Sequence, residues 1–378
     1  MTLYLIVFLA ALVFAFLSDV CERQIVTEQK LSLRTSVKRS LLGLRSARTT
    51  LIICSALVLV VLSGVRYDTG YDYMYSYVPS LETVRAGDAS HYDPFFNFII
   101  SIFAKLNDNQ WFFAATAAYT VFMMYLGFVL ESKYVTVPVA LYFCSFNYLR
   151  SFCFVAQYTA MATLFVGFIL LLKKKYIGAV VLLIVGVLLH KSAEIMIVFY
   201  LCYFLSTKVL LIISLFFPVI AEIGHSFFRS IIVHFASGSR FDEYIAGQYD
   251  VGYEDTTLIT VNLLAFAIFL LVILYEQKNV VSDKKAMMFF LAQSLALGFA
   301  CLQTVIPVGY RFVWYFALFQ IVSIPYMLKY VLHGALFYIA CGLICAAYYY
   351  WMIKYPIASG ASQILPYHPY FNPEITIE

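Results

Sequence analysis

Three arginines stand where long apolar runs end: Arg66 in GVRYDTGYDYMYSYVP, Arg150 in FNYLRSFCF and Arg311 in VGYRFVWYF. An arginine costs about 2.5–3.5 kcal/mol at the centre of a membrane and less near its surface, so each of them needs a partner there. The side chain of any one of them could instead extend to lipid headgroups. Because all three lie beside tyrosines at the corresponding ends of their runs, we expect them to share one anionic ligand.

A second polar group interrupts the apolar sequence in LLHKSAE. His190 ends one apolar run, and Lys191, Ser192 and Glu194 precede the next. Polar residues between two membrane-buried stretches need protein partners or a water-filled cavity. The segment is therefore expected at the same level as the three arginines. A hydrogen-bonded histidine at a helix end is the alternative role for His190.

Other polar residues near these positions are candidates for a supporting role. Gln157 lies seven residues after Arg150, which puts both on one face of a helix; the alternative for Gln157 is helix packing. Asp93 and Pro94 suit the N-cap and the first position of a helix. The predicted supporting residues are Tyr67, Gly70, Tyr73, Asp93, Gln157, Lys191, Ser192, Tyr310, Tyr315 and Tyr367.

The elements that must position these residues are membrane helices. Of the 378 residues, 63% are apolar and only 12% are charged, about half the charge density of soluble proteins. A helix needs about 20 apolar residues to cross the hydrocarbon layer. The sequence therefore predicts an all-α polytopic integral membrane protein, a single membrane domain over residues 1–378, with about 12 transmembrane helices. The predicted spans are 2–19, 49–65, 109–130, 135–149, 151–172, 176–190, 191–206, 208–224, 257–276, 286–305, 311–329 and 333–353.

Lysine and arginine residues gather on one side of the predicted spans. The 20–48 segment holds seven of them and LLKKKY adds three. Cytoplasmic loops of membrane proteins collect these residues, so this side is predicted to be cytoplasmic and both termini to lie outside. The first apolar run has neither a basic start nor a small-residue cleavage site, and we expect a membrane span there rather than a signal peptide.

Four segments lie outside the predicted spans. Residues 20–48 form the basic cytoplasmic loop, and residues 66–107 form an outer loop with a short interfacial or re-entrant helix at 91–107. The tail 354–378 is predicted to be outside. The long outer loop 225–256 interleaves aromatic residues with Asp, Glu and Gln, which suits a lid over a sugar; a solvated linker is the alternative. The eight cysteines are scattered without a CxxC pair, which favours apolar packing over a metal site.

The order of several motifs resembles that of the EpsG/Wzy-type polysaccharide polymerases, which make O-antigen, capsule or exopolysaccharide. The motifs are GVRYDTGYDYMYSY, DPFFNFI, LRSFCFVAQYTAMA, LLHKSAEI, YRFVWYFALFQIVSIP and PYHPYF. The resemblance covers the chain from about Arg66 to Tyr367. Many members of the family carry Gln where this chain has Ser151, and Glu where it has Asp93, which puts the detailed role of both segments in question.

The resemblance implies a GT-C-like membrane glycosyltransferase of the bacterial cytoplasmic (inner) membrane. It would transfer a growing glycan from a polyisoprenyl diphosphate, such as undecaprenyl diphosphate, to a sugar hydroxyl of another lipid-linked repeat unit. The active site would lie on the extracytoplasmic, or periplasmic, side. The implied partners are the lipid-linked oligosaccharide as donor and acceptor, membrane lipid and a chain-length regulator protein, with no nucleic acid. No cofactor and no metal are expected.

The charged residues suit such a transfer. Guanidinium groups bind phosphate oxygens through paired hydrogen bonds and favour the charge that develops on a leaving diphosphate. Arg66, Arg150 and Arg311 are therefore the expected diphosphate ligands. A base would assist the attacking hydroxyl; the candidates are Asp72, Asp68 and His190, and the sequence does not separate Asp72 from His190.

Other functions use similar residues. A membrane O-antigen ligase or an O-acyltransferase that uses His190 is the alternative among enzymes. A transporter or flippase of lipid-linked glycans also requires arginines beside a diphosphate. A flippase is expected to carry cationic groups at several depths of its helix bundle, whereas here they gather at one side.

Overall fold

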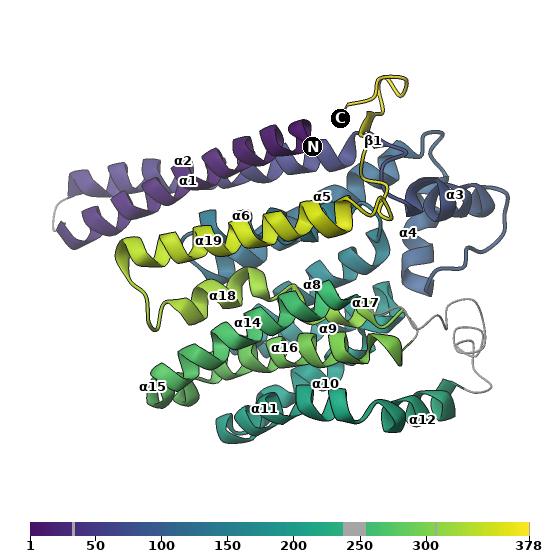
Figure 1. Ribbon diagram of the computed structural model, residues 1–378. Coiled ribbons are helices and arrows are strands. Elements are labelled where there is room, and N and C mark those ends of the chain that lie inside the picture. The colour runs from purple at the N-terminus through teal and green to yellow at the C-terminus, as the bar shows by residue number, and fades with distance from the viewer. Residues whose placement is uncertain (32–34, 237–254, 307, 378) are drawn as a thin grey trace. The chain divides into compact units, whose positions relative to one another are not determined.

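The computed structural model describes residues 1–31, 35–236, 255–306 and 308–377, which are almost entirely helical (Figure 1). Among these residues, seven helices are long and apolar enough to cross a membrane. Two further pairs of helices pass this test together but are bent at a break, by 87° and by 47°. The chain is thus a polytopic helical membrane protein. The seven single segments are Thr2–Gln29, Leu41–Gly64, Gln110–Glu131, Val155–Leu172, Thr256–Tyr275, Lys284–Thr304 and Gly334–Ile357.

The described residues therefore provide seven to nine spans, fewer than the 12 predicted. The difference lies in the predicted spans 135–149, 176–190 and 191–206, whose helices are short. α6 (Thr136–Cys144) ends where Phe146 adopts a left-handed conformation with φ 65°. α9 (Tyr176–Leu189) ends where His190 becomes extended, and α10 (Ile195–Leu201) has only seven residues. Apolar composition alone does not reveal such breaks.

The chain forms two compact units. Unit 1 consists of Met1–Ala193 and Cys341–Glu378, and unit 2 of Glu194–Ala340. The elements of unit 1 are α1 (Thr2–Leu31), α2 (Thr35–Gly64), β1 (Arg66–Tyr67), η1 (Tyr73–Tyr77), α3 (Val78–Arg85), α4 (Pro94–Ala104), α5 (Gln110–Glu131), α6, α7 (Asn147–Arg150), α8 (Val155–Leu172), α9, η5 (Ile353–Ile357) and β2 (His368–Pro369).

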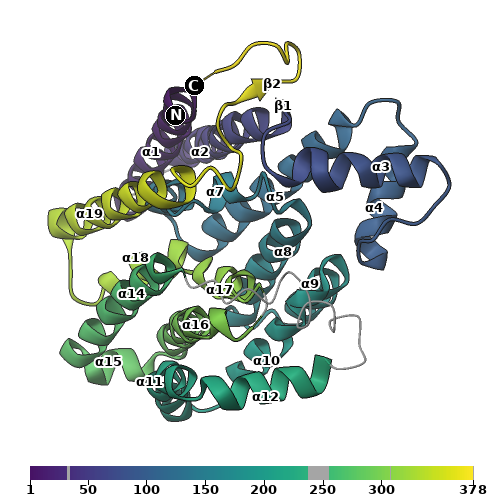
Figure 2. The same cartoon turned by 45° about the vertical axis from the view of Figure 1, so that its right-hand side comes forward.

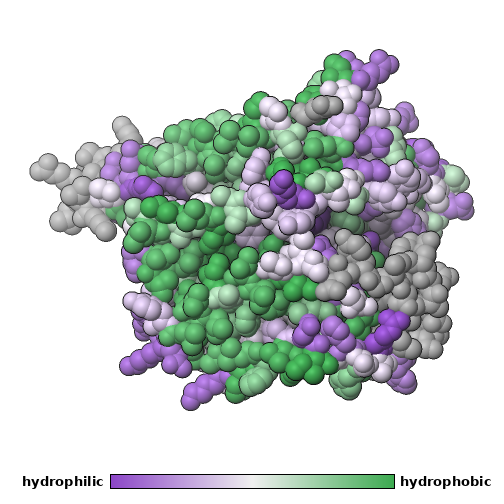
Figure 3. Space-filling view, in the orientation of Figure 1, coloured by the Kyte–Doolittle hydropathy of each residue, from purple (hydrophilic) through white to green (hydrophobic). Residues whose placement is uncertain are grey.

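α1 and α2 form an antiparallel helical hairpin in unit 1 (Figure 1). The segment 20–48 thus contains the ends of two long helices, with residues 32–34 outside the described ones. Buried Asp19 near the middle of α1 accepts hydrogen bonds from the main-chain N–H groups of Val135 and Thr136, at 2.8 and 3.0 Å, which satisfies the start of α6. Apolar residues cover the exposed face of this hairpin, and hydrophilic residues gather near β1 and α3 (Figure 3).

Both termini lie at the same end of unit 1. The hydroxyl of Tyr4 donates to the carbonyl of Ile364 at 2.7 Å, which joins the start of α1 to the C-terminal tail. β2 in this tail pairs antiparallel with β1, with Arg66 opposite Pro369 (Figure 2). We call this end of unit 1 the terminal end. That both termini lie outside the membrane stays a prediction.

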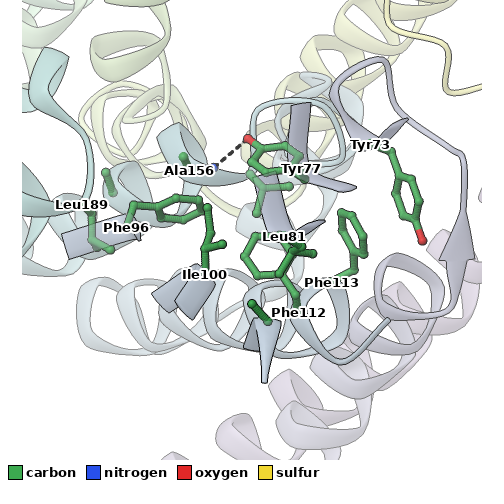
Figure 4. Packing of buried hydrophobic residues seen from close by; sticks show 12 residues of the cluster. Tyr73, Tyr77, Leu81, Phe96, Ile100, Phe112, Phe113, Ala156 and Leu189 are labelled. Atoms are coloured by element: carbon green, nitrogen blue, oxygen red, sulfur yellow. Dashed lines mark hydrogen bonds between the residues drawn. The ribbon is translucent and has the colours of Figure 1, made fainter. Parts of the chain in front are cut away.

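An aromatic cluster packs η1, α3 and α4 against α5 and α8 (Figure 4). The helix predicted to begin at Pro94 is present as α4, with Asp93 at its N-cap position. Tyr77, Phe96 and Phe112 are buried within the cluster, and the hydroxyl of Tyr77 accepts a hydrogen bond from the N–H of Ala156 at 3.1 Å. The cluster thereby fixes the polar segment after α2 to the first turn of α8.

Unit 2 is built around α16, which packs against α11, α14 and α17. Its elements are α10, η3 (Cys202–Phe204), α11 (Thr207–Ile223), α12 (His225–Ala236), α14 (Thr256–Tyr275), α15 (Gln277–Ser282), α16 (Lys284–Cys301), η4 (Leu302–Thr304), α17 (Tyr310–Ala317), α18 (Gln320–Leu328) and the first part of α19 (Gly334–Met352). Buried Gln320 donates to the Oδ1 of Asn262 at 2.9 Å and to the Oε1 of Gln293 at 2.8 Å, which joins α14, α16 and α18 through satisfied polar groups. Most of the predicted outer loop 225–256, including its proposed sugar lid, lies outside the described residues; its first part is α12.

Candidate active site at the terminal end of unit 1

The guanidinium group of Arg66 is enclosed by protein, with the residue only 2% exposed. It donates hydrogen bonds to the carbonyls of Thr69 and Phe152, each at 3.2 Å, and to that of Ser63. The rings of Phe113 and Phe152 lie 5.2 and 4.8 Å from its central carbon. Burial lowers the pKa of Arg66, and nearby tyrosines act in the opposite direction. Arg66 therefore joins the end of α2 to the turn that follows Arg150.

Gln110, the first residue of α5, completes this connection. Its Nε2 donates to the carbonyls of Arg66, at 3.0 Å, and of Gly64. Its Oε1 accepts from the hydroxyl of Tyr73 at 3.0 Å, and the Tyr73 ring stacks on Phe113 with 3.9 Å between centroids. Burial raises the pKa of Tyr73. Gln110 was not among the predicted site residues, and a glutamine at the start of an apolar run was the only signal for it.

Gly70 is needed for a close approach within the protein. Its φ of +99° lies in the left-handed region, and a Cβ there would lie 2.7 Å from the carbonyl oxygen of Phe152. The N–H groups of Gly70 and Tyr71 donate to the carbonyls of Gln363 and Ser362 at 2.8 and 3.0 Å. The C-terminal tail therefore forms one wall of the site.

Arg150 lies at a break between two helices. It ends the four-residue helix α7, and a turn at 151–154 separates it from α8. The residue is 7% exposed, its guanidinium lies over the ring of Phe146, and its Nη1 contacts the hydroxyl of Tyr158 at 3.5 Å. Tyr158 in turn donates to Asn147 at 3.0 Å. The side chains of Phe146 and Tyr158 thus contact Arg150, whereas Arg66 is held by main-chain carbonyls.

The charges of three predicted site residues act on one atom, the sulfur of Cys153. Burial raises the pKa of Cys153 to about 12; the nearby charge of Asp72 acts in the same direction, and those of Arg66 and Arg150 oppose it. The thiol donates to the carbonyl of Ser362 at 3.0 Å. Asp72, Arg66 and Arg150 are therefore all near enough to Cys153 for their charges to act on its thiol. Cys153 had been expected only to fill space.

Asp72 immediately precedes η1 and is half-buried. One turn further, the Oγ of Ser76 lies 2.7 Å from the hydroxyl of Tyr92 and 3.4 Å from the Nε2 of His91. These groups make a polar strip beside Asp72. His91 was not among the predicted site residues, although it lies three residues before Pro94, the predicted first residue of this helix.

The segment LLHKSAE connects with this region through Asp93. The Oδ2 of Asp93 accepts a hydrogen bond from the N–H of Lys191 at 2.7 Å, so the carboxylate joins the end of α9 to the start of α4. His190 is half-buried, and its Nδ1 lies 3.2 Å from the Oγ of Ser192. His190 thus lies at the terminal end of unit 1, as Arg150 does.

The remaining predicted residues of unit 1 surround the same end. Gln157 is buried in the first turn of α8. Half-buried Tyr67 contacts the ring of Tyr73, with centroids 5.8 Å apart. Tyr367 is buried, and its hydroxyl donates to the carbonyl of Leu62 at 2.9 Å. These residues hold the walls of the site together.

Arg311 belongs to unit 2. It lies in the first turn of α17, after Val308 with φ 50°, and its side chain is partly exposed. Tyr310 precedes it, and its ring is tilted by 52° against that of Trp314 with 5.0 Å between centroids; Tyr315 is buried. Arg66 and Arg150 come together within unit 1, and Arg311 stands at a helix start in the other unit.

Within the described part of the chain, no three His, Cys, Asp or Glu side chains lie close enough together to hold a metal ion.

No curated protein and no solved structure matches the sequence. The family model described as the EpsG family matches residues 49–368, a range that contains Arg66, Arg150, His190, Arg311 and Tyr367. The chain therefore belongs to the EpsG family of membrane proteins.

Proposed function

We propose that this protein polymerises lipid-linked oligosaccharide repeat units in a bacterial cytoplasmic membrane. The donor is a glycan attached to a polyisoprenyl diphosphate, and the acceptor is a sugar hydroxyl on a second lipid-linked unit. Membership of the EpsG family supports a polysaccharide polymerase of the membrane-glycosyltransferase type. A GT-C-like arrangement and an extracytoplasmic active site belong to the same proposal.

The main support is the hydrogen bond from Arg66 to the carbonyl of Phe152 in the turn after Arg150, together with the charges of Arg66, Arg150 and Asp72 that all act on Cys153. Arg150 is the proposed ligand of the diphosphate from unit 1, because its guanidinium is held by aromatic side chains beside a break between helices. Arg66 contributes positive charge and holds the turn after Arg150 in place through its hydrogen bonds to carbonyls. Guanidinium groups in a partly dry site favour the negative charge that develops as a diphosphate leaves.

The reaction breaks the bond between the anomeric carbon of the donor and its diphosphate oxygen. A new bond forms between that carbon and the acceptor oxygen, whose proton passes to a base. Asp72 is the proposed base, because it shares its surroundings with Arg150. His190, beyond the Asp93–Lys191 connection, is the second candidate. A base that is correctly placed typically contributes about 10²–10⁴-fold in rate.

Arg311 is proposed as a further ligand of the donor diphosphate, with Tyr310 and Tyr315 as supporting residues. A single arginine neutralises only part of a diphosphate, so a second guanidinium group increases the stabilisation of the leaving group. Membrane lipid and a chain-length regulator protein are further proposed partners.

The proposal is tested with purified protein in lipid nanodiscs and the lipid-linked single repeat unit that accumulates in cells lacking this gene. We expect polymer without ATP, an ion gradient or an acyl donor, and near-complete loss in Arg150→Lys, because a point charge does not replace the paired hydrogen bonds of arginine. Arg85→Lys is the matched control, since exposed Arg85 contacts Ala104 and Asn109 away from Cys153. Substrate that stays monomeric with folded wild-type protein would refute the polymerase, and polymer of normal length from Arg150→Lys would remove Arg150 from the site.

A further inference from the structure

Two tyrosines beside Asp72 point away from the core. Tyr71 is 47% exposed and Tyr75 is 66% exposed. Their rings are stacked, with 4.8 Å between centroids and 19° between planes. Both follow the membrane segment that ends at Gly64. An exposed pair of large aromatic side chains contributes little to folding and often marks a binding surface.

The backbone that carries this pair is held on both sides. The N–H of Tyr71 donates to the carbonyl of Ser362 in the tail at 3.0 Å. Tyr73 and Tyr77, which alternate with the exposed pair, are each only 2% exposed and pack into the aromatic cluster (Figure 4). The two exposed rings are therefore presented by a rigid segment, which lowers the entropic cost of binding a ligand.

Polar residues are the direct neighbours of the exposed pair in the chain. Asp72 follows Tyr71 and Ser76 follows Tyr75, and both side chains are half-buried. Ser76 is joined to the hydroxyl of Tyr92 at 2.7 Å. A flat aromatic surface beside a carboxylate and hydroxyl groups complements a pyranose ring, which has an apolar C–H face and a rim of hydroxyls.

We propose that Tyr71 and Tyr75 form a platform for a pyranose ring of the acceptor glycan, and this inference rests on the proposed polymerase function. The pyranose ring lies over the outer face of one ring of the stacked pair and directs one hydroxyl towards Asp72, the proposed base. Holding a nucleophile beside its base in this way lowers the entropic part of the barrier. The platform therefore selects the acceptor, whereas Arg150 binds the diphosphate of the donor.

The first test measures glycan binding. The probe is the free oligosaccharide released by mild acid from the lipid-linked single repeat unit, and saturation-transfer NMR with full-length protein in nanodiscs measures its affinity. We expect the Tyr71→Ala and Tyr75→Ala double variant to bind at least about tenfold more weakly than the wild type. The Tyr71→Phe and Tyr75→Phe double variant keeps the rings, and its affinity for the oligosaccharide should stay within about twofold of the wild-type affinity. Tyr275→Ala, at a tyrosine 78% exposed in unit 2, is the matched control and binds as the wild type does.

The second test measures chain extension. The double alanine variant should raise the KM for the acceptor far more than it lowers kcat, with an unchanged unfolding temperature. Wild-type glycan affinity and wild-type acceptor KM in that variant, while polymer still forms, would overturn the platform and leave the polymerase intact. Glycan binding that depends on the two rings in a protein that makes no polymer would instead refute the polymerase and retain the sugar site.

A membrane role for the two rings gives a different result. This is tested in a Tyr75→Trp variant with the three native tryptophans changed to phenylalanine. If the platform binds the acceptor glycan, the tryptophan fluorescence should change when the oligosaccharide is added and should be quenched only weakly by brominated lipid chains. Strong quenching by brominated lipids without a response to the oligosaccharide would show that the pair anchors the protein in the lipid interface and would overturn the proposal.

Discussion

The Nη2 of Arg66 donates a hydrogen bond, 3.2 Å long, to the main-chain carbonyl of Phe152, two residues after Arg150. The two arginines of unit 1 thus have different surroundings. Arg66 is surrounded by carbonyls and rings that fix the turn, and Arg150 ends the short helix before that turn. This relationship assigns Arg66 a positioning role in the proposed reaction, in addition to its charge.

Substitution of Arg66 by lysine should destabilise the protein. Lysine lacks the planar group that reaches the carbonyls of Thr69, Phe152 and Ser63 together. Each buried carbonyl left without a donor costs about 1–3 kcal/mol, so we expect a lower unfolding temperature and a loss of polymer. Thermal unfolding and chain extension are measured on the same preparation. Arg66→Lys with normal stability and no activity would show instead that Arg66 acts directly on the diphosphate.

The pH dependence of chain extension separates Asp72 from His190. With a carboxylate as the base, the rate of chain extension falls when the pH drops below about 5, whereas with a histidine it falls already near pH 6.5. We expect the wild-type rate to fall only below about pH 5. Asp72→Asn should lose nearly all of the rate, and His190→Ala should be severely slowed without a change in the pH at which the rate falls. A fall in the wild-type rate near neutral pH that is absent in His190→Ala would make His190 the base. An unaltered rate in His190→Ala at all pH values would leave His190 with a packing role.

The C-terminal tail should protect Cys153 from alkylation. Burial raises the pKa of Cys153 to about 12, so the group remains a neutral thiol at pH 8, and the tail residue Ser362 covers its sulfur at 3.0 Å. In a variant in which Cys153 is the only cysteine, we expect slow reaction with maleimide at pH 8 while the protein is folded. Removal of residues 361–378 should accelerate the reaction and abolish polymer formation.

The control for this experiment is Cys54, half-buried in α2 and distant in sequence from the tail. As the only cysteine, it should react equally fast in the full-length and the shortened protein. Equal protection of Cys153 in both proteins would show that the tail does not cover the site.

Substitution of Arg311 by lysine tests whether this residue binds the donor diphosphate. We expect Arg311→Lys to lose nearly all chain extension at a normal unfolding temperature, because a point charge does not replace the paired hydrogen bonds of arginine. Arg85→Lys is the control and should extend chains as the wild type does. Polymer of normal length from Arg311→Lys would exclude Arg311 from the site.

The sequence determined the class of this protein because membrane insertion depends on composition over long windows. The apolar runs define the membrane helices, and Asp93 with Pro94 marks the start of α4. The order of short motifs indicated the family to which residues 49–368 belong. These features depend on local chemistry, which the sequence contains directly.

Only the tertiary structure decided how the polar residues are used. Arg66 and Arg150 look alike in the sequence, but the enclosure of Arg66 depends on Phe152 and Phe113, which are far from it along the chain. The role of the tail likewise arises from hydrogen bonds between Gly70 and Gln363, nearly three hundred positions apart. The breaks before Arg150 and at His190 come from backbone conformations that hydropathy does not encode. Contacts between distant segments determine which charged group is enclosed and which lies beside the site, because burial is a property of the folded chain.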